Sequence, residues 1–190
     1  MHDLRVSKNR IQAANARFAE MRKLFFSRTL PTRLKSLALR AYIYPTLTWA
    51  SETWILATVA RKKLQTWWNK RARICLGVTK KAHIPMDTIF ERTGLEEIYE
   101  MLCRRRLKYL GHIVRYPVDR WVRKTVAAAR PEKARNRGRP KSTWLNETVR
   151  TLRARNGALI DCYDKARWRD ITKKNPKPKS QSPTVNQSGH

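Results

Sequence analysis

The sequence contains six aspartates, the residue type that a two-metal polymerase or nuclease uses to hold its cations. Such a centre needs carboxylates that converge, and no two aspartates are adjacent in the chain. Asp161 and Asp164 share a helical face, but Lys165, Arg167 and Arg169 are their neighbours. Helix capping and pairing with Lys165 account for both aspartates. Since no glycine-rich phosphate loop of Walker type is present either, the sequence predicts no catalytic centre.

The three cysteines and two of the histidines are the remaining candidates for metal ligation or nucleophilic catalysis. These residues are Cys75, His83, Cys103, His112 and Cys162. They lack the C-x2-C or H-x3–5-H spacing that anchors a zinc site, and no histidine lies where it would activate a thiol. An odd number of widely spaced cysteines argues against a disulfide framework. We therefore expect buried thiols, no metal, no cofactor and an intracellular, reduced setting.

The charge balance favours binding over catalysis. The chain has 43 Lys and Arg against 14 Asp and Glu, a net charge of +29 over 190 residues. Such a surface repels itself and costs folding free energy unless a polyanion neutralises part of it. Nucleic acid is therefore the expected partner, well ahead of an anionic membrane. No run approaches the ~18 apolar residues of a membrane span, and the first ten residues lack an apolar stretch of signal-peptide type.

The basic segment 135–141 (RNRGRPK) is the first candidate for nucleic-acid contact. Its R-G-R-P core resembles an AT-hook, whose arginines enter the minor groove of A·T-rich DNA. Glycine permits close approach of the backbone, and proline keeps the chain extended. A flexible basic linker without groove preference explains the segment equally well. The candidate contact residues are Arg135, Arg137, Arg139 and Lys141.

Two helical clusters supply further candidates. In the first, Arg104, Arg105, Arg106 and Lys108 follow one another on a helix whose apolar stripe holds Cys103 and Leu107. Lys108 and one or two of the arginines should then face outward, where phosphate contact is favoured over a merely solvated face. In the second, Trp67 lies beside Lys70 and Arg71 and could stack on a base, although tryptophan at helical spacing is more often core.

The spacing of apolar residues predicts an all-α fold, with no convincing period-2 strand. One helical face carries Ile11, Ala14, Phe18, Met21 and Phe25, with Lys8, Arg10 and Arg17 around the remainder. A second helix should open at Pro31, run through Leu34, Leu37 and Ala41, and end or kink at Pro45. The aromatic stretch 42–54 is interpreted as core, and a third helix over 58–76 should bury Leu64, Trp68, Ala72 and Cys75.

The second half of the chain is predicted to hold shorter helices and a linker. Gly94 should separate a short helix from a longer one near Leu95, with Glu100 pairing with Arg104 at i,i+4. Ser142 should cap a helix stopped by Gly157, and a last helix over 161–173 should present Tyr163, Trp168 and Ile171. The expected domains are 1–80 (a thumb-like bundle), 81–128 (a helical segment), 129–141 (a basic linker), 142–173 (a helical pair) and 174–190 (a disordered tail).

Four stretches occur in an order that is similar to a known family. The run 10–54 (RIQAANARFAEMRKLFFSRTLPTRLKSLALRAYIYPTLTWASETW) resembles the thumb of non-LTR, LINE-like retrotransposon reverse transcriptases. That thumb ends in a leucine, tyrosine, glycine, glutamate and tryptophan pattern. Here Leu47, Trp49, Ala50, Glu52 and Trp54 occupy those places, so the tyrosine and glycine differ. Downstream, RRRLKYLGHIVR (104–115), RGRPKSTW (137–144) and ARWRD (166–170) resemble the segment that follows the thumb, in the same order.

The resemblance implies an element-encoded protein whose whole form copies its RNA into DNA at a nicked chromosomal target. In such enzymes the thumb holds the primer–template duplex, and downstream segments bind RNA or target DNA. By position, Lys8, Arg10 and Arg17 belong to the thumb, and Arg104, Arg105, Lys108, Arg137 and Arg139 to the later segment. The aspartate-bearing palm motif, the fingers and an endonuclease are absent from this sequence. The resulting hypothesis is a non-catalytic, nuclear fragment that binds DNA, RNA or a hybrid and pairs with the missing palm and fingers.

Two other functions remain open at this point. One is a free-standing, chromatin-associated DNA-binding protein built around the RGRPK segment, for which changing Arg137 and Arg139 to alanine would abolish A·T-selective binding. The other is a ribosome-associated RNA-binding protein, which would sediment with ribosomal subunits.

Overall fold

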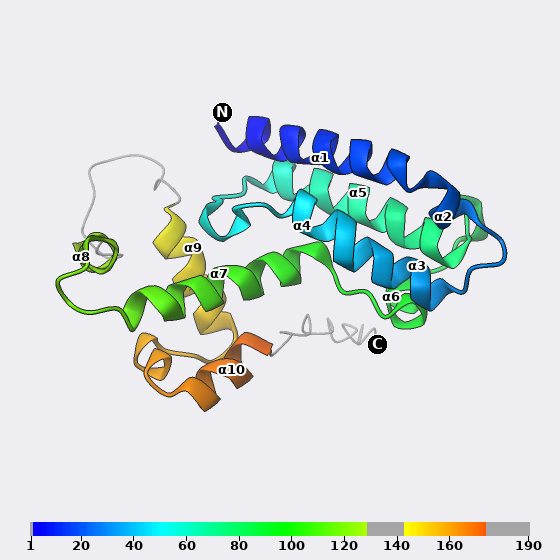
Figure 1. The fold of residues 1–190 in the computed structure, drawn as a ribbon. Coiled ribbons are helices and arrows are strands. Elements are labelled where there is room, and N and C mark those ends of the chain that lie inside the picture. The colour runs from blue at the N-terminus through cyan, green and yellow to red at the C-terminus, as the bar shows by residue number, and fades with distance from the viewer. Residues whose placement is uncertain (1, 129–142, 174–190) are drawn as a thin grey trace, which may run out of the picture.

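The computed structural model describes residues 2–128 and 143–173, and within these ranges the chain is helical and contains no β-strand, as predicted (Figure 1). The elements are α1 (His2–Glu20), α2 (Arg22–Phe26), α3 (Thr32–Ala38), the π-helical η1 (Leu39–Ile43), α4 (Tyr44–Leu47), η2 (Ser51–Thr53), α5 (Thr58–Leu76), η3 (Lys80–Ala82), α6 (Met86–Thr93), α7 (Ile98–Val114), α8 (Trp121–Ala128), α9 (Trp144–Ala154), η4 (Leu159–Cys162) and α10 (Lys165–Lys173). The predicted linker, 129–141, and the predicted tail, 174–190, lie outside the described residues.

Helices α1 and α5 lie side by side along one edge of the molecule (Figure 1). The predicted inward face of α1 and α2 is confirmed, because Ala14, Phe18 and Phe25 are buried and the two phenylalanine rings stack with their centroids 4.4 Å apart. The bounds predicted for α5 are also confirmed, and its predicted apolar stripe is buried. Long stripes of this kind identify helices well because burial of one face supplies most of their stability.

The helical path from Thr32 to Leu47 continues past Pro45, where the sequence predicted an end or a kink. Proline cannot donate a backbone hydrogen bond, and its ring clashes with the carbonyl of the preceding turn. The π-helical segment η1 comes directly before this point, and its wider turn accommodates the proline. The chain therefore runs through α3, η1 and α4 as one rod.

The inward face of this rod carries only some of its leucines. Leu34 and Leu37 are exposed, at 48% and 58%, whereas Leu39, Ile43 and Leu47 are fully buried. The buried set follows i, i+4, i+8 spacing and turns the earlier leucines outward. The aromatic stretch 42–54 is core only in part, since the side chains of Tyr42 and Trp49 are 54% and 65% exposed while Trp54 is buried.

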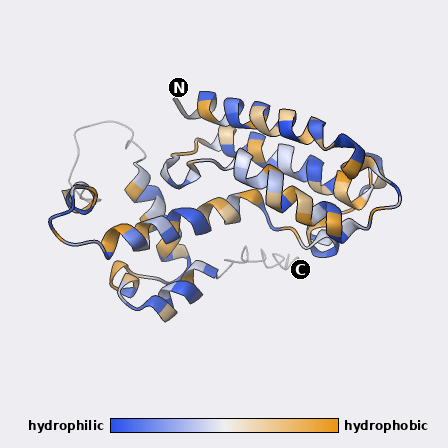
Figure 2. Cartoon of the chain, viewed as in Figure 1, coloured by the Kyte–Doolittle hydropathy of each residue, from blue (hydrophilic) through white to orange (hydrophobic). Residues whose placement is uncertain are grey.

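Helix α7 contributes to two separate cores. Its first half packs Ile98, Met101 and Leu102 with α1, α3, η1, α5 and α6, and its second half packs Leu107 and Leu110 with α9 and α10. Hydrophobic and hydrophilic residues alternate along α7 in Figure 2. We call the two groups the first and second modules. The first module draws on both the 1–80 and the 81–128 ranges, so residue 80 does not divide the two cores.

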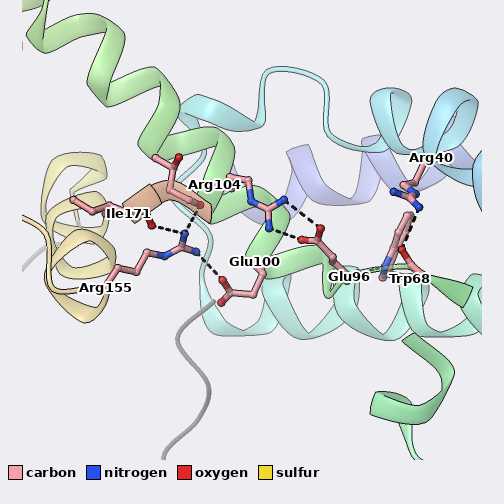
Figure 3. Close-up of polar contacts among 9 residues, drawn as sticks. Arg40, Trp68, Glu96, Glu100, Arg104, Arg155 and Ile171 are labelled. Carbon is pink, nitrogen blue, oxygen red and sulfur yellow. Dashed lines mark hydrogen bonds and ion pairs between the residues drawn. The ribbon is translucent and has the colours of Figure 1, made fainter. Parts of the chain in front are cut away.

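The connection between α6 and α7 follows the prediction, but the ion pairs do not. Gly94 separates the two helices in the left-handed region, with φ +63. Glu100 pairs with Arg155 of the α9 end, at 2.7 Å, and Arg104 pairs with Glu96 (Figure 3). The predicted Glu100–Arg104 pair is therefore wrong, because both residues find partners outside their own helical turn.

The second module corrects several local predictions. Thr143 rather than Ser142 caps α9, accepting a hydrogen bond from the Asn146 amide at 3.3 Å. Asn156, with φ +57, takes the left-handed position that follows α9, while Gly157 leaves room for Leu152 and Ile171. The last predicted helix divides into η4 and α10. Of the three residues that this helix is expected to present, Trp168 and Ile171 are buried and Tyr163 is 54% exposed.

Asp161 and Asp164 cap helical turns, as expected. Asp161 accepts a hydrogen bond from the Ala158 amide at 2.8 Å, and Asp164 accepts from the amides of Ala166 and Arg167 at 2.9 and 3.1 Å. The ion-pair partner of Asp161 is Arg167, at 2.8 Å, instead of Lys165. Both aspartates are thus occupied in stabilising the turns around η4 and α10.

Candidate nucleic-acid interface

A basic groove of about 1040 Å³ runs between α1 and α5. Its cationic side chains are Arg5 and Lys8 from α1 and Lys62, Lys63 and Lys70 from α5. The remaining lining residues are polar or apolar, and among the described residues that line it none is acidic. We call this feature the α1–α5 groove. It concentrates positive charge in a concave surface, which is the arrangement that attracts a polyanion most strongly.

The groove follows from the spacing of residues on the two helices. Arg5, Lys8 and Gln12 lie at i, i+3, i+7 on α1, and Lys62, Thr66 and Lys70 lie at i, i+4, i+8 on α5. Each set forms a stripe along one helical face. Ala14, Phe18, Leu64 and Trp68 bury the opposite faces in the first core. Both basic stripes therefore face solvent on the same side of the contact between α1 and α5.

Asn15 joins the two helices at one end of the groove. Its side-chain oxygen accepts a hydrogen bond from Trp67 Nε1 at 2.8 Å and another from Arg71 Nη2 at 2.7 Å. The Arg71 guanidinium lies 4.3 Å from the Phe18 ring centroid and 4.8 Å from that of Trp67. Burial lowers the pKa of Arg71 from its ordinary value. These contacts hold α1 against α5.

The prediction that Trp67 could stack on a base is therefore not supported by its surroundings. Its side chain is only 8% exposed, and Arg71 covers one face of the ring. Arg71 itself, a candidate for phosphate contact, is occupied by Asn15 and by the two rings. Of this predicted cluster, Lys70 remains exposed and lines the groove.

The arginine cluster on α7 also serves internal contacts. Arg104 donates two hydrogen bonds to the Glu96 carboxylate, as Figure 3 shows. Arg105 bonds to Glu52 and, at 2.8 Å, to the Thr48 hydroxyl. Arg104 and Arg105 are therefore engaged in internal ion pairs while remaining partly exposed, and their contact with phosphate stays a prediction. Lys108 is exposed, as predicted.

In the second module, a buried arginine also makes hydrogen bonds and an ion pair inside the fold. Arg155 donates to Glu100 Oε2 at 2.7 Å and to the backbone carbonyl of Thr172 at 2.7 Å, with a longer contact of 3.5 Å to that of Ile171 (Figure 3). Burial raises the pKa of Glu100, and the nearby Arg155 opposes that rise. The guanidinium thus joins α7, α9 and α10.

The remaining predicted site residues divide into three groups. Lys8 lines the α1–α5 groove, and Arg10 lines a smaller pocket on the other flank of α1. Arg17 is exposed and pairs with Glu20 at 2.8 Å, a surface pair that contributes little to stability. The AT-hook-like candidates Arg135, Arg137, Arg139 and Lys141 lie outside the described residues.

Sequence reasoning did not select Arg5, Lys62 and Lys63 as site residues. The informative pattern is that basic residues recur at helical spacing on α1 and on α5, and that α5 lies in a stretch without acidic residues between Glu52 and Asp87. The pattern becomes a site only when the packing of α1 on α5 is known.

The cysteines show no sign of a reactive or metal-binding role. Cys75, Cys103 and Cys162 are free and buried. Burial raises the pKa of the Cys75 thiol to about 12 and that of Cys162 to about 11, and it also raises that of Cys103. Across residues 2–128 and 143–173, no three histidine, cysteine, aspartate or glutamate side chains gather closely enough to hold a metal ion.

The chain matches no protein-family model, no curated protein and no solved structure. None of the described helices has the length and apolar character that crossing a lipid bilayer requires.

Proposed function

We propose that this chain is a non-catalytic nucleic-acid-binding protein that holds a phosphate backbone in the α1–α5 groove. The observation that carries the proposal is the groove itself, in which five cationic side chains converge without an acidic neighbour among the described lining residues. Cations in such a position replace the counterions condensed on a duplex, and the release of those counterions drives binding. Backbone contact of this kind positions a duplex without reading its sequence.

We further propose that the chain corresponds to the thumb and downstream segment of a non-LTR reverse transcriptase, the parent activity being RNA-directed DNA synthesis. Contacts between the stretches that carry the resemblance support this. Glu52 of the first stretch pairs with Arg105 of the second, and Trp144 of the third donates to the Glu52 carbonyl at 2.6 Å. Gly111 of the second stretch lies directly against Trp168 of the fourth.

The backbone at Ala50 gives separate support. Ala50 occupies the place of the glycine in the family pattern, and it adopts a left-handed conformation with φ +54. Glycine is the residue that takes this conformation without steric cost. A left-handed backbone at the place where the family pattern has glycine supports the proposal, although the residue here is alanine. On this proposal the palm and fingers that such a thumb serves are partners of this segment, and its location is nuclear.

Binding is tested by fluorescence anisotropy with DNA duplex, RNA–DNA hybrid and single-stranded ligands over a range of salt concentrations. We expect the logarithm of the association constant to fall linearly with the logarithm of salt concentration. The Lys62→Ala, Lys63→Ala double variant should make this slope shallower by about 0.9 for each phosphate that the variant no longer neutralises. Lys80→Ala, Lys81→Ala is the matched control, since that adjacent, exposed pair lies in η3, away from the groove.

Two outcomes would count against the proposed function. Binding that is absent or independent of salt removes its first part, as does an equal effect of the groove and control variants. The non-catalytic part is tested by primer extension with the purified chain and magnesium. Extension of the primer under these conditions would show that the chain synthesises DNA by itself.

A further inference from the structure

A second, smaller pocket of about 250 Å³ lies on the opposite flank of α1 from the basic groove. Val6 and Arg10 form its α1 wall, and the turn after α4 supplies Trp49 and Ala50. The other lining residues are Thr53, Trp54 and Leu56. The volume lies below the roughly 300–1,000 Å³ of pockets that take drug-sized ligands, so a single small ring system is the fitting occupant.

The chemistry of this pocket suits a planar aromatic ring next to a negative charge. The Trp49 side chain is 65% exposed and offers an uncommitted indole face, whereas Trp54 is buried and belongs to the core. Arg10 is the cationic lining residue, and no acidic side chain lines the pocket within the described part of the chain. A base stacks on an exposed indole in a sequence-tolerant way, and an adjacent arginine attracts its phosphate.

The pocket offers little means of distinguishing one base from another. The uncharged polar side chain in the pocket is that of Thr53, and the Thr53 hydroxyl already donates a hydrogen bond to the Ala50 carbonyl at 3.0 Å. Val6, Leu56 and the two indoles are apolar or nearly so. Stacking rather than hydrogen-bond readout therefore dominates, and all four bases should be accepted.

The position of the pocket connects it to the groove. Arg5 and Lys8 of the groove and Val6 and Arg10 of the pocket alternate along the same two turns of α1. A strand that leaves the groove therefore needs to cross only one helix, about 10–12 Å wide with its side chains, to reach Trp49. We infer that this pocket binds an unpaired base from the single-stranded overhang of a duplex held in the α1–α5 groove. The inference rests on the proposed function and adds a single-strand subsite to it.

The test compares two duplexes with the same short overhang, one intact and one with an abasic site in place of each overhang base. The phosphates are identical, so any difference in affinity reports the bases. We expect the wild-type chain to bind the intact overhang roughly tenfold more tightly, the order of one stacked base. Trp49→Ala should bring this ratio close to one, and Trp49→Phe should restore part of it.

Trp121→Ala is the matched control, because Trp121 is 80% exposed but lies in α8 of the other half of the molecule, and it should leave the ratio unchanged. Equal binding of the intact and abasic overhangs by the wild-type chain would overturn the inference while leaving duplex binding in the groove intact. Loss of the ratio in Trp121→Ala but not in Trp49→Ala would also overturn it. Failure to bind either duplex would remove both the inference and the proposed function.

Discussion

Arg105 of α7 and Glu52 of η2 form an ion pair that joins residues 53 positions apart in the chain, with Arg105 Nε 2.9 Å from Glu52 Oε1. The Glu52 backbone carbonyl also accepts a hydrogen bond from Trp144 Nε1 at 2.6 Å. One residue thus contacts both α7 and α9, through its side chain and its backbone. The turn that follows α4 is in this way tied to both modules.

Replacing Glu52 with glutamine should destabilise the fold by about 1–2 kcal/mol. Hydrogen bonds to charged groups contribute about 1.5–3 kcal/mol when well shielded, and this pair is partly exposed to solvent. Urea denaturation followed by circular dichroism measures the change. Glu20→Gln is the control, since the exposed Arg17–Glu20 pair should be worth less than about 0.5 kcal/mol. Equal effects of the two substitutions would contradict the assigned role of Glu52.

Ala50→Gly should stabilise the protein by about 0.5–1 kcal/mol. A non-glycine residue in the left-handed region costs about 1–2 kcal/mol, and the greater freedom of glycine in the unfolded chain offsets part of the gain. Thermal melting provides the measurement. Ala16→Gly, at an exposed position inside α1, should instead destabilise by about 0.5–1 kcal/mol. A loss of stability in both variants would show that the turn at Ala50 does not strain the alanine.

Gly111→Ala should destabilise the second module by about 1–3 kcal/mol, the usual cost of overpacking a core. A Cβ at this position would lie 2.2 Å from Trp168 Nε1. Pairing the change with Trp168→Leu should recover part of the loss, because the smaller side chain leaves the space that the new methyl group needs. Additive effects of the two substitutions, measured by chemical denaturation, would rule out the contact as the cause.

The three cysteines should react slowly with thiol reagents in the folded protein and rapidly once it is unfolded. The thiolate is the reactive species, and burial raises the pKa of each thiol above its ordinary value. Labelling with iodoacetamide at about pH 8, with and without denaturant, tests this expectation. Rapid labelling of Cys75 or Cys162 without denaturant would contradict it.

The same shifts predict a loss of stability in base. The folded state keeps the Cys75 proton until about pH 12, whereas the unfolded chain releases it near 9.0. A folded-state pKa above the unfolded value means that stability is fully present below 9.0 and falls as the pH rises toward 12. The Cys75→Ala variant should show a smaller decline than the wild type, because it lacks the thiol whose pKa differs between the folded and the unfolded state. Parallel declines would show that Cys75 has no part in the loss.

Residues with strong local patterns were predictable from the sequence. The bounds of α5 and the break at Gly94 follow from one apolar stripe and one glycine. The inward face of the rod from Thr32 to Leu47 did not follow, because leucines occur on two of its faces. Burial of Leu39, Ile43 and Leu47 over Leu34 and Leu37 depends on packing with α1 and α5 that the local sequence does not contain.

The candidate site was predictable only in part, for a related reason. An arginine looks the same in sequence whether it faces solvent or a carboxylate. Arg104, Arg105 and Arg71 have partners 8, 53 and 56 positions away, so their internal roles appear only in the fold. Lys8 and Lys70, in contrast, could be identified because lysines on the polar face of an amphipathic helix are rarely buried.

Because α7 supplies side chains to both cores, it also fixes the distance between them. Its 17 residues span roughly 25 Å at about 1.5 Å per residue. That length matches the rise of roughly seven base pairs of B-form duplex at about 3.4 Å each. A ligand that contacts both modules therefore meets them at a spacing that a continuous helix fixes. A flexible linker in its place would allow the spacing to vary.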